Sequence, residues 1–395
     1  MFNLYFHPDP TGTGLVIGDL AAGLVKLGHD VTVVTTVPHY GLDSAPTEYR
    51  RRLIYEEHWQ GVKILRTAVH VPRRKTILSR LLNYLSYSLL SIPAGLKGPR
   101  PDVILGVLPP ITTGPSVWLV SLLRRTPLVL NIQDVYPDTI FKKRLAAKLN
   151  RALERFIFRR ATRLTALSTS QRDSIIFRGA HPDRVDVIPM WTDLEGITPS
   201  SNLNPFRAEH AAGASLLALY AGNIGMLSGV NILLDAAKLL EHDPRIRILI
   251  VGRGNGLPAL LARAAQLNFP NVTFLPTQPR ERLSEMLAAA DIGLVTLDPR
   301  LSETSVPSKT FTIMAAARPV LAAISPHNEI ARIDNELADS IVAEDSVGVG
   351  SETSSSSSRY GRRRSSRTSR VSEYQITYRC GQGRAESAET ETGEK

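Results

Sequence analysis

Glycine-rich turns directly after apolar runs are the first residues of this sequence whose type and spacing indicate chemistry. Residues 222–225 (GNIG) follow one apolar run, and residues 252–254 (GRG) follow the next. A turn without side chains lets a ligand approach the backbone, and free amides at a helix start attract an anion. The dinucleotide-binding fingerprint is incomplete, because no acidic residue follows the third run, 272–275. Phosphate contacts are predicted at Gly222, Asn223, Gly225, Gly252 and Arg253.

A similar turn occurs near the start of the chain. Residues 7–14 (HPDPTGTG) follow the first apolar run and open a segment with helical spacing. Gly12, Thr13 and Gly14 would present backbone amides at a helix start, which predicts contact with the same ligand from the other half of the chain. The alternative is a plain turn between a strand and a helix.

A lysine at another predicted helix start suits a diphosphate. In residues 306–310 (VPSKT), Ser308, Lys309 and Thr310 would offer backbone amides together with one cation. The alternative is an ordinary helix cap by Ser308 beside a solvated lysine. We favour the diphosphate contact.

Polar residues also follow a strongly apolar run in the first half. Residues 131–138 (NIQDVYPD) contain two acids and two amides, which a buried core does not explain. A helix cap accounts for Asp138 but not for Asp134, so Asp134 is the candidate catalytic residue, placed to hold a substrate hydroxyl. The histidines are scattered without ligand spacing and Cys380 is the single cysteine, so no metal site is predicted.

The elements that must position these residues form an α/β pattern. Short apolar runs alternate with helical spacing in both halves, which predicts two parallel sheets covered by helices. Ligands bind such sheets at the carboxyl ends of the strands, where the turns above fall. The expected strands are 1–6, 31–35, 103–107 and 128–132 in the first half, and 216–221, 246–251, 272–275, 292–296 and 320–323 in the second.

The composition of the connecting and final segments predicts the domain limits. Residues 198–213 are rich in Ser, Asn and Pro and indicate a linker between a first domain at 1–197 and a second at 214–345. Residues 346–395 are rich in Ser and Arg, have few aliphatic residues and are predicted to be a disordered tail. The α/β pattern stops abruptly near 337–350, so the second domain is incomplete. A binding tail is one explanation, and a changed reading frame, which we favour, is the other.

The charge and the single cysteine limit the partners and the compartment. A net charge of +10 and a pI of about 9.8 favour anionic partners. One cysteine excludes an internal disulfide and fits a reducing compartment. Because no secretory signal and no uninterrupted membrane span are visible, the sequence predicts a cytoplasmic location.

A basic and apolar segment, residues 73–100, predicts peripheral contact with the inner face of the plasma membrane. The apolar helix expected at 78–96 has Arg73, Arg74 and Lys75 before it and Lys97 and Arg100 after it. Such a helix can lie on an anionic membrane surface. The alternative is a helix buried in the first domain. A second basic stretch, 142–163, is predicted to be a solvated helical face.

Six motifs, taken in order, resemble the retaining glycosyltransferases of family 4, and most of all the branch that contains the colanic-acid and N-acetylfucosamine transferases of bacterial surface polysaccharides. The resemblance runs from residue 1 to about residue 336. The motifs are GHDVTVVTTVPHYG (28–41), DVILGVLPPITTG (102–114), LVLNIQDVYPDT (128–139), VDVIPMWTDL (185–194), LYAGNIG (219–225) and VPSKTFTIMAAARPVLA (306–322).

This resemblance implies the GT-B architecture, in which two Rossmann-like domains face each other across a cleft. It implies transfer of a hexose, such as a deoxy or N-acetylamino sugar, from a nucleoside-diphosphate sugar to a lipid-linked or polysaccharide acceptor, with retention and without cofactor or catalytic metal. The sequence departs from the family at Thr304 and Thr312, which stand where many members have glutamates, and at Ala317, which stands for a helix glycine.

Three other functions are compatible with parts of the pattern. A GT-B epimerase would act on the same nucleotide sugar but would leave the basic segment at 73–100 unexplained. A catalytically degenerate nucleotide-sugar-binding protein would fit the missing glutamates and the unusual C-terminus. Nucleic-acid binding requires clustered charge with exposed aromatic residues, and an aromatic content of 6% argues against it.

Overall fold

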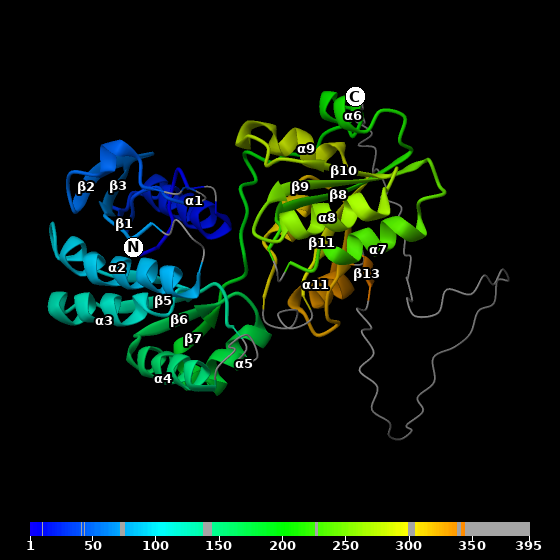
Figure 1. Cartoon of the computed structure of the whole chain (residues 1–395). Coiled ribbons are helices and arrows are strands. Elements are labelled where there is room, and N and C mark those ends of the chain that lie inside the picture. The colour runs from blue at the N-terminus through cyan, green and yellow to red at the C-terminus, as the bar shows by residue number, and fades with distance from the viewer. Residues whose placement is uncertain are drawn as a thin grey trace, which may run out of the picture.

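The protein contains two α/β units, seen in a computed structural model (Figure 1). The structure describes residues 1–9, 11–40, 42, 44–71, 76–136, 144–225, 228–298, 305–337 and 341–343. The predicted tail, 346–395, lies outside the described residues.

The first unit is built on one mostly parallel sheet that the N-terminal segment completes. Its two parts have the strand orders β1-β3-β2 and β4-β5-β6-β7. Phe2 joins them, because it pairs in parallel with Val34 on one side and with Gly106 on the other. The segment predicted as a strand at 1–6 therefore lies between β1 and β4, where that strand was expected, but it pairs with each of them only through Phe2. The strands are β1 (Thr32–Thr36), β2 (Ile54–Trp59), β3 (Val62–Thr67), β4 (Ile104–Leu108), β5 (Leu128–Ile132), β6 (Arg163–Ala166) and β7 (Val185–Val187).

Helices cover both faces of this sheet. Crossovers between parallel strands are right-handed, and the crossover through α1 runs across the sheet in the opposite direction to the later ones. Hence α1 lies on one face, whereas α2, α3 and α4 lie side by side on the other (Figure 1). The helices are α1 (Gly12–Lys26), α2 (Ile77–Gly95), α3 (Thr113–Arg124), α4 (Arg144–Arg160) and α5 (Thr169–Phe177), with short 3₁₀ turns η1 (Thr47–Tyr49) and η3 (Pro182–Arg184).

An antiparallel hairpin at the edge of the first sheet was not predicted. Strands β2 and β3 pair from Ile54 to Thr67 through a tight turn at Gln60 and Gly61. Both turn residues have positive φ, 48° and 77°, which matches the right-handed twist of the strands. A Cβ on Gly61 would lie 2.7 Å from Val25 Cγ1, so packing against α1 also requires glycine there.

The second unit contains a parallel sheet in the order β10-β9-β8-β11-β12-β13. All five strands predicted in this half are present. Strands β8 and β9 run two residues further than expected, because the glycine turns continue the pairing. The elements are α6 (Pro205–His210), β8 (Leu216–Asn223), α7 (Asn231–Leu239), β9 (Ile246–Arg253), α8 (Leu257–Leu267), β10 (Val272–Leu275), η4 (Arg280–Arg282), α9 (Leu283–Ala289), β11 (Ile292–Thr296), α10 (Lys309–Ala315), β12 (Val320–Ala323), α11 (Glu329–Leu337) and β13 (Ile341–Ala343).

The segment predicted as a linker, 198–213, is packed against the second unit. Phe206 of α6 is fully buried in the core on one face of the second sheet. The guanidinium of Arg207 donates to the Ala289 carbonyl at 2.8 Å and lies 2.8 Å from the Asp291 carboxylate. These contacts hold α6 to the second unit. The domain limits themselves stay predictions.

Candidate functional site

The two glycine turns of the second unit form one interlocked structure at the carboxyl ends of β8 and β9. Gly222 pairs with Gly252, and the Ile224 amide donates to the Arg253 carbonyl at 2.9 Å. A Cβ on Gly252 would lie 1.9 Å from the Gly222 carbonyl oxygen, and one on Gly254 would lie 2.3 Å from the Ile224 carbonyl oxygen. The glycines are therefore required by backbone-to-backbone contact.

Lys309, the first residue of α10, lies against this structure. Its ammonium group is 3.8 Å from the centre of the Tyr220 ring, and a Cβ on Gly222 would lie 3.2 Å from Lys309 Nζ. The absence of a side chain at Gly222 thus leaves the ammonium group directly beside the backbone of the turn. This geometry brings a cation and two glycine turns together, as an anion site requires.

The neighbours of Lys309 are less available to a ligand. Ser308 precedes the helix, but its side chain makes no capping hydrogen bond. The structure therefore does not support the alternative of an ordinary serine cap. The Thr310 amide already donates to the Pro307 carbonyl at 3.1 Å, and the Thr310 side chain is buried. Of the three residues predicted here, Lys309 is the one that lies against the glycine turns.

At the start of α1, the two predicted glycines differ in how accessible their backbone is to a ligand. Thr11 caps the helix, because its Oγ1 accepts a hydrogen bond from the Gly14 amide at 2.9 Å. A Cβ on Gly14 would lie 2.6 Å from that oxygen, whereas a Cβ on Gly12 would meet nothing within 4 Å. Gly12 therefore borders open space, while the Gly14 amide is already bonded.

Asp134, after the end of β5, faces the second unit. Its carboxylate accepts a hydrogen bond from the Ser305 hydroxyl at 2.6 Å, and Ser305 precedes Lys309 by four residues. The Asn328 amide donates to the Ser305 carbonyl at 2.9 Å and holds that residue in place. Burial raises the pKa of Asp134, and the hydrogen bond from Ser305 offsets this only in part. The predicted catalytic carboxylate and the predicted cation loop thus meet across the two units.

Other residues also join the two units. The Arg253 guanidinium lies over the Tyr40 ring, 5.3 Å from its centre. Arg280 of η4 lies 3.0 Å from an Asp19 carboxylate oxygen and 3.4 Å from one of Asp193. The connecting chain is fixed at both ends, because the Trp191 indole donates to the Val16 carbonyl at 3.2 Å and the Thr198 amide donates to Ser284 Oγ at 3.1 Å.

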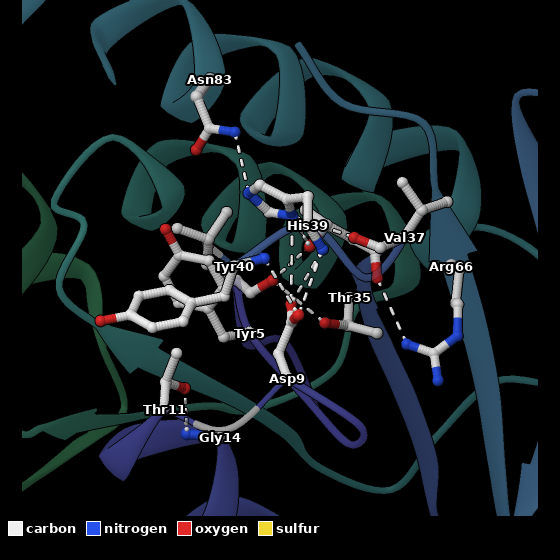
Figure 2. Close-up of polar contacts among 12 residues, drawn as sticks. Tyr5, Asp9, Thr11, Gly14, Thr35, Val37, His39, Tyr40, Arg66 and Asn83 are labelled. Atoms are coloured by element: carbon white, nitrogen blue, oxygen red, sulfur yellow. Dashed lines mark hydrogen bonds and ion pairs between the residues drawn. The ribbon is translucent and has the colours of Figure 1, made fainter. Parts of the chain in front are cut away.

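A buried polar cluster holds loops of the first unit together (Figure 2), and Tyr40 in one of these loops contacts Arg253 of the second unit. The Asp9 carboxylate accepts the backbone amides of His39 and Tyr40 at 3.1 and 3.0 Å. His39 Nδ1 lies 2.9 Å from the Val37 carbonyl, an acceptor, so Nδ1 carries the proton and Nε2 accepts from the Asn83 amide at 3.0 Å. Burial lowers the pKa of His39, so the ring is neutral and its 4.0 Å approach to Asp9 is no ion pair.

The lowered pKa of His39 predicts a dependence of stability on pH. His39 binds a proton less readily in the folded than in the unfolded chain, so the free energy of unfolding should fall as the pH decreases below about 7. The pKa of His7 is lowered as well, first by burial, and contributes with the same sign. Urea unfolding at several pH values measures the slope. The slope should become smaller in His39→Gln, and an unchanged slope would contradict the assignment of a neutral His39.

The sequence predictions did not include Tyr40, His39 and Ser305. The first two lie in the loop after β1, three and four residues beyond its last residue, so their position near a strand end was the available signal. Ser305 had no comparable signal, because its role depends on a contact with Asp134, which is distant in the sequence. Among the described residues, no group of three His, Cys, Asp or Glu side chains is placed to hold a metal ion.

Two family models match successive parts of the chain. Residues 11–191 match the "Glycosyl transferase 4-like domain" and residues 216–348 match "Glycosyl transferases group 1". The first match covers most of the first unit of the fold, and the second match covers most of the second unit.

The chain is a glycosyltransferase.

Relatives and solved structures agree with this identification. The glycosyltransferase is 26% identical over 357 residues to WcaI of Escherichia coli (strain K12), which is named as a colanic acid biosynthesis glycosyl transferase, and the match covers 84% of each chain. Its fold is similar to sucrose-phosphate synthase from Thermosynechococcus elongatus, with a TM-score of 0.67, 15% identity and coverage of 87% and 85% of the two chains. It is also similar to Anabaena HepE in complex with UDP-glucose, with a TM-score of 0.59, 15% identity and coverage of 86% and 89%. The predicted GT-B fold is confirmed.

Proposed function

We propose that this glycosyltransferase moves a hexose, such as a deoxy or N-acetylamino sugar, from a nucleoside-diphosphate sugar to a lipid-linked or polysaccharide acceptor, with retention of configuration. The observation that carries the proposal is the position of the Lys309 ammonium group beside the backbone of Gly222. A diphosphate needs a cation and close access to backbone, and both occur together here at the carboxyl edge of the second sheet.

The remaining predicted residues have complementary roles in this proposal. Arg253, on the strand next to Gly222, is the second cation and turns from Tyr40 to the diphosphate when the donor binds. Ser308 and Thr310 shape the loop around Lys309, and Asn223 and Gly225 form the turn below it. Gly12, Thr13 and Gly14 border the donor from the first unit. Neither metal nor cofactor is needed, since cations and amides offset the charge of the leaving diphosphate.

Asp134 contacts the transferred sugar or the acceptor. It lies across from the cation loop, and its bond to Ser305 ties it to the same segment that carries Lys309. In the retaining reaction, an oxygen of the donor phosphate would take the proton of the acceptor hydroxyl as that hydroxyl attacks the anomeric carbon. Asp134 would orient the sugar for this step.

The acceptor side of the proposal includes contact of α2 with an anionic membrane on the cytoplasmic side. Thr76 caps α2, and Leu78 and Leu89 on this helix are 65% and 67% exposed, so the alternative of a fully buried helix does not fit. Residues 73–75, the predicted basic flank before this helix, lie outside the described residues. In the part of the chain that the structure describes, no helix is both long enough and apolar enough to cross a membrane.

Replacement of Lys309 by methionine should weaken donor binding by about 10- to 100-fold, since a hydrogen bond to a charged group contributes about 1.5–3 kcal/mol. Thermal unfolding with a panel of nucleoside diphosphates, including UDP, measures the affinity through the shift in Tm. Lys309→Arg should recover part of the affinity. Lys238→Met removes an exposed lysine of α7 that pairs with Glu241; it is the matched control and should leave the affinity unchanged. An unaltered Tm shift in Lys309→Met would reject the donor site.

A further inference from the structure

The loop that carries Asp134 begins where the pairing of β5 with its neighbour ends. The Gln133 amide still donates to the Leu108 carbonyl of β4 at 2.8 Å, one residue before Asp134. A catalytic group must be held to within about 0.5 Å of its working position, and side chains that bond to the backbone of a loop can supply this precision. Two backbone carbonyls of this loop, one residue before Asp134 and two residues after it, make such bonds.

The carbonyl before Asp134 is held by Gln171 of α5. The Gln171 side chain is fully buried, and its Nε2 donates to the Gln133 carbonyl at 3.2 Å. Its Oε1 accepts a hydrogen bond from the Leu167 amide at 2.6 Å. Leu167 is packed among the apolar residues that form the core of the second unit. The carboxamide of Gln171 therefore connects the backbone beside Asp134 to a segment that contacts the second unit.

The carbonyl after Asp134 is held by Arg178, the residue that follows α5. Its guanidinium donates to the Tyr136 carbonyl at 2.9 Å and to the Glu154 carboxylate of α4 at 2.5 Å. Arg178 and Glu154 are both buried, and Glu154 also accepts a hydrogen bond from the Asn150 side chain at 2.8 Å. A buried guanidinium that bonds to a carboxylate and to a carbonyl is held firmly, because the loss of either partner leaves a buried charge poorly compensated.

These two side chains act on Asp134 through the backbone. Burial raises the pKa of Asp134, and the hydrogen bond from Ser305 lowers it in part. Arg178 is not among the causes of this shift, so its charge is not what sets the state of the carboxylate. A purely structural bridge between α4 and α5 would explain the ion pair of Arg178 with Glu154. It would not explain why Gln171 and Arg178 both bond to the one loop that carries Asp134.

We propose that Gln171 and Arg178 are positioning residues of this glycosyltransferase, which hold the loop of Asp134 so that its carboxylate stays buried where the two units meet. Helix α5 and the residue after it would then contribute to the reaction without touching the substrate. The inference rests on the proposed role of Asp134 in sugar transfer. Without these bonds the loop would loosen, water would reach the carboxylate, and its orientation toward the sugar would be lost.

Titration of the Asp134 carboxyl group by NMR, with isotope-labelled aspartate, tests this role in the full chain without any ligand. The signal is assigned by its absence from Asp134→Asn. The test variants are Gln171→Met and Arg178→Met/Glu154→Leu. The second variant replaces both members of the buried pair with apolar residues, so that no unpaired charge hinders folding. In both variants the pKa of Asp134 should fall toward that of an ordinary aspartate, because the carboxylate becomes better solvated.

The rate of sugar transfer should fall together with this pKa. Release of nucleoside diphosphate should be about 10- to 100-fold slower in both variants, since a small displacement of a catalytic group has an effect of this size. Arg178→Lys keeps the charge but lacks the fork that makes two bonds, so it should recover part of the rate. The Tm shift with UDP should stay that of wild type, because the donor cations are untouched.

Arg207→Met is the matched control. Arg207 is likewise buried, lies 2.8 Å from the Asp291 carboxylate and donates to the Ala289 carbonyl, but all three residues belong to the second unit. This variant should be less stable and should keep the pKa of Asp134. An unchanged pKa in both test variants, or an equal fall in the control, would overturn the proposal. So would a rise of the pKa in Arg178→Met/Glu154→Leu, which would mean that the Arg178 charge acts directly on the carboxylate.

The proposed role of Asp134 is tested separately. A wild-type rate of sugar transfer in Asp134→Asn would count against that role, whatever the titration shows. A slow Asp134→Asn with an unchanged pKa in both test variants would keep the role of Asp134 and reject the positioning by Gln171 and Arg178.

Discussion

Replacement of Asp134 by asparagine should lower the rate of sugar transfer by about 100- to 1,000-fold, while nucleoside diphosphate binding stays within about twofold of wild type. Asparagine keeps the shape and can still accept the hydrogen bond from Ser305, but it removes the negative charge that faces the sugar. The loss of one preorganised polar group at a reacting centre has an effect of this size. Release of free nucleoside diphosphate, with and without acceptor, measures the rate.

The raised pKa of Asp134 predicts how the activity should depend on pH. Burial shifts the pKa upward, so protonation inactivates the carboxylate at a higher pH than for an ordinary aspartate, and activity should fall on the acidic side as the pH decreases through that pKa. The acidic limb should disappear in Asp134→Asn. Ser305→Ala, which removes the hydrogen bond and leaves the charge, should cost less than about tenfold. A wild-type rate of sugar transfer in Asp134→Asn would show that Asp134 is not a catalytic residue.

Replacement of Gly252 by alanine should lower the free energy of unfolding by about 3 kcal/mol or more. The new Cβ would lie 1.9 Å from the Gly222 carbonyl oxygen, and φ at this position is +154°, a backbone conformation that an L side chain rarely adopts. Since the clash is with backbone, no side chain can move aside. Urea denaturation measures the change.

Gly23→Ala in α1 is the control, because a Cβ there would meet nothing within 4 Å. Alanine should stabilise this helix by about 0.5–1 kcal/mol. A loss of less than about 1 kcal/mol in Gly252→Ala would mean that the two glycine turns are not in tight contact.

The parallel sheets could be predicted because their strands are short, apolar and bounded by turns. The run 128–132 has the predicted limits, since a strand buried on both faces needs continuous apolar residues. The run 272–275 also has the predicted limits, although β10 lies at the edge of its sheet and its residues are half-buried. The β2–β3 hairpin could not be predicted in this way. Its outer strand β2 lies at the edge of the sheet, the residues of β2 are half-buried or exposed, and their pattern is correspondingly polar.

The parts of the candidate site that follow strands were predictable, and the contacts between them were not. Gly222, Gly252 and Asp134 each come after an apolar run, so topology alone places them at carboxyl edges. The link between Asp134 and Ser305 depends on how the two units meet, and no local pattern encodes that. Ala317 shows a further limit: the resemblance leads one to expect a glycine here, and the alanine has φ +52°, in the left-handed region where glycine usually ends a helix.

The connecting chain is attached to both units. Trp191 is bonded to the first unit and Thr198 to the second, so residues 192–197 are the stretch between the two attachments. Arg280 lies beside this stretch and holds both Asp19 and Asp193, and its side chain is 48% exposed. Exposed ion pairs weaken as salt is added, whereas apolar packing does not. Added salt should therefore weaken this link between the connecting chain and the two units, whereas the apolar contacts of Leu167 and Met190 with the core of the second unit should persist.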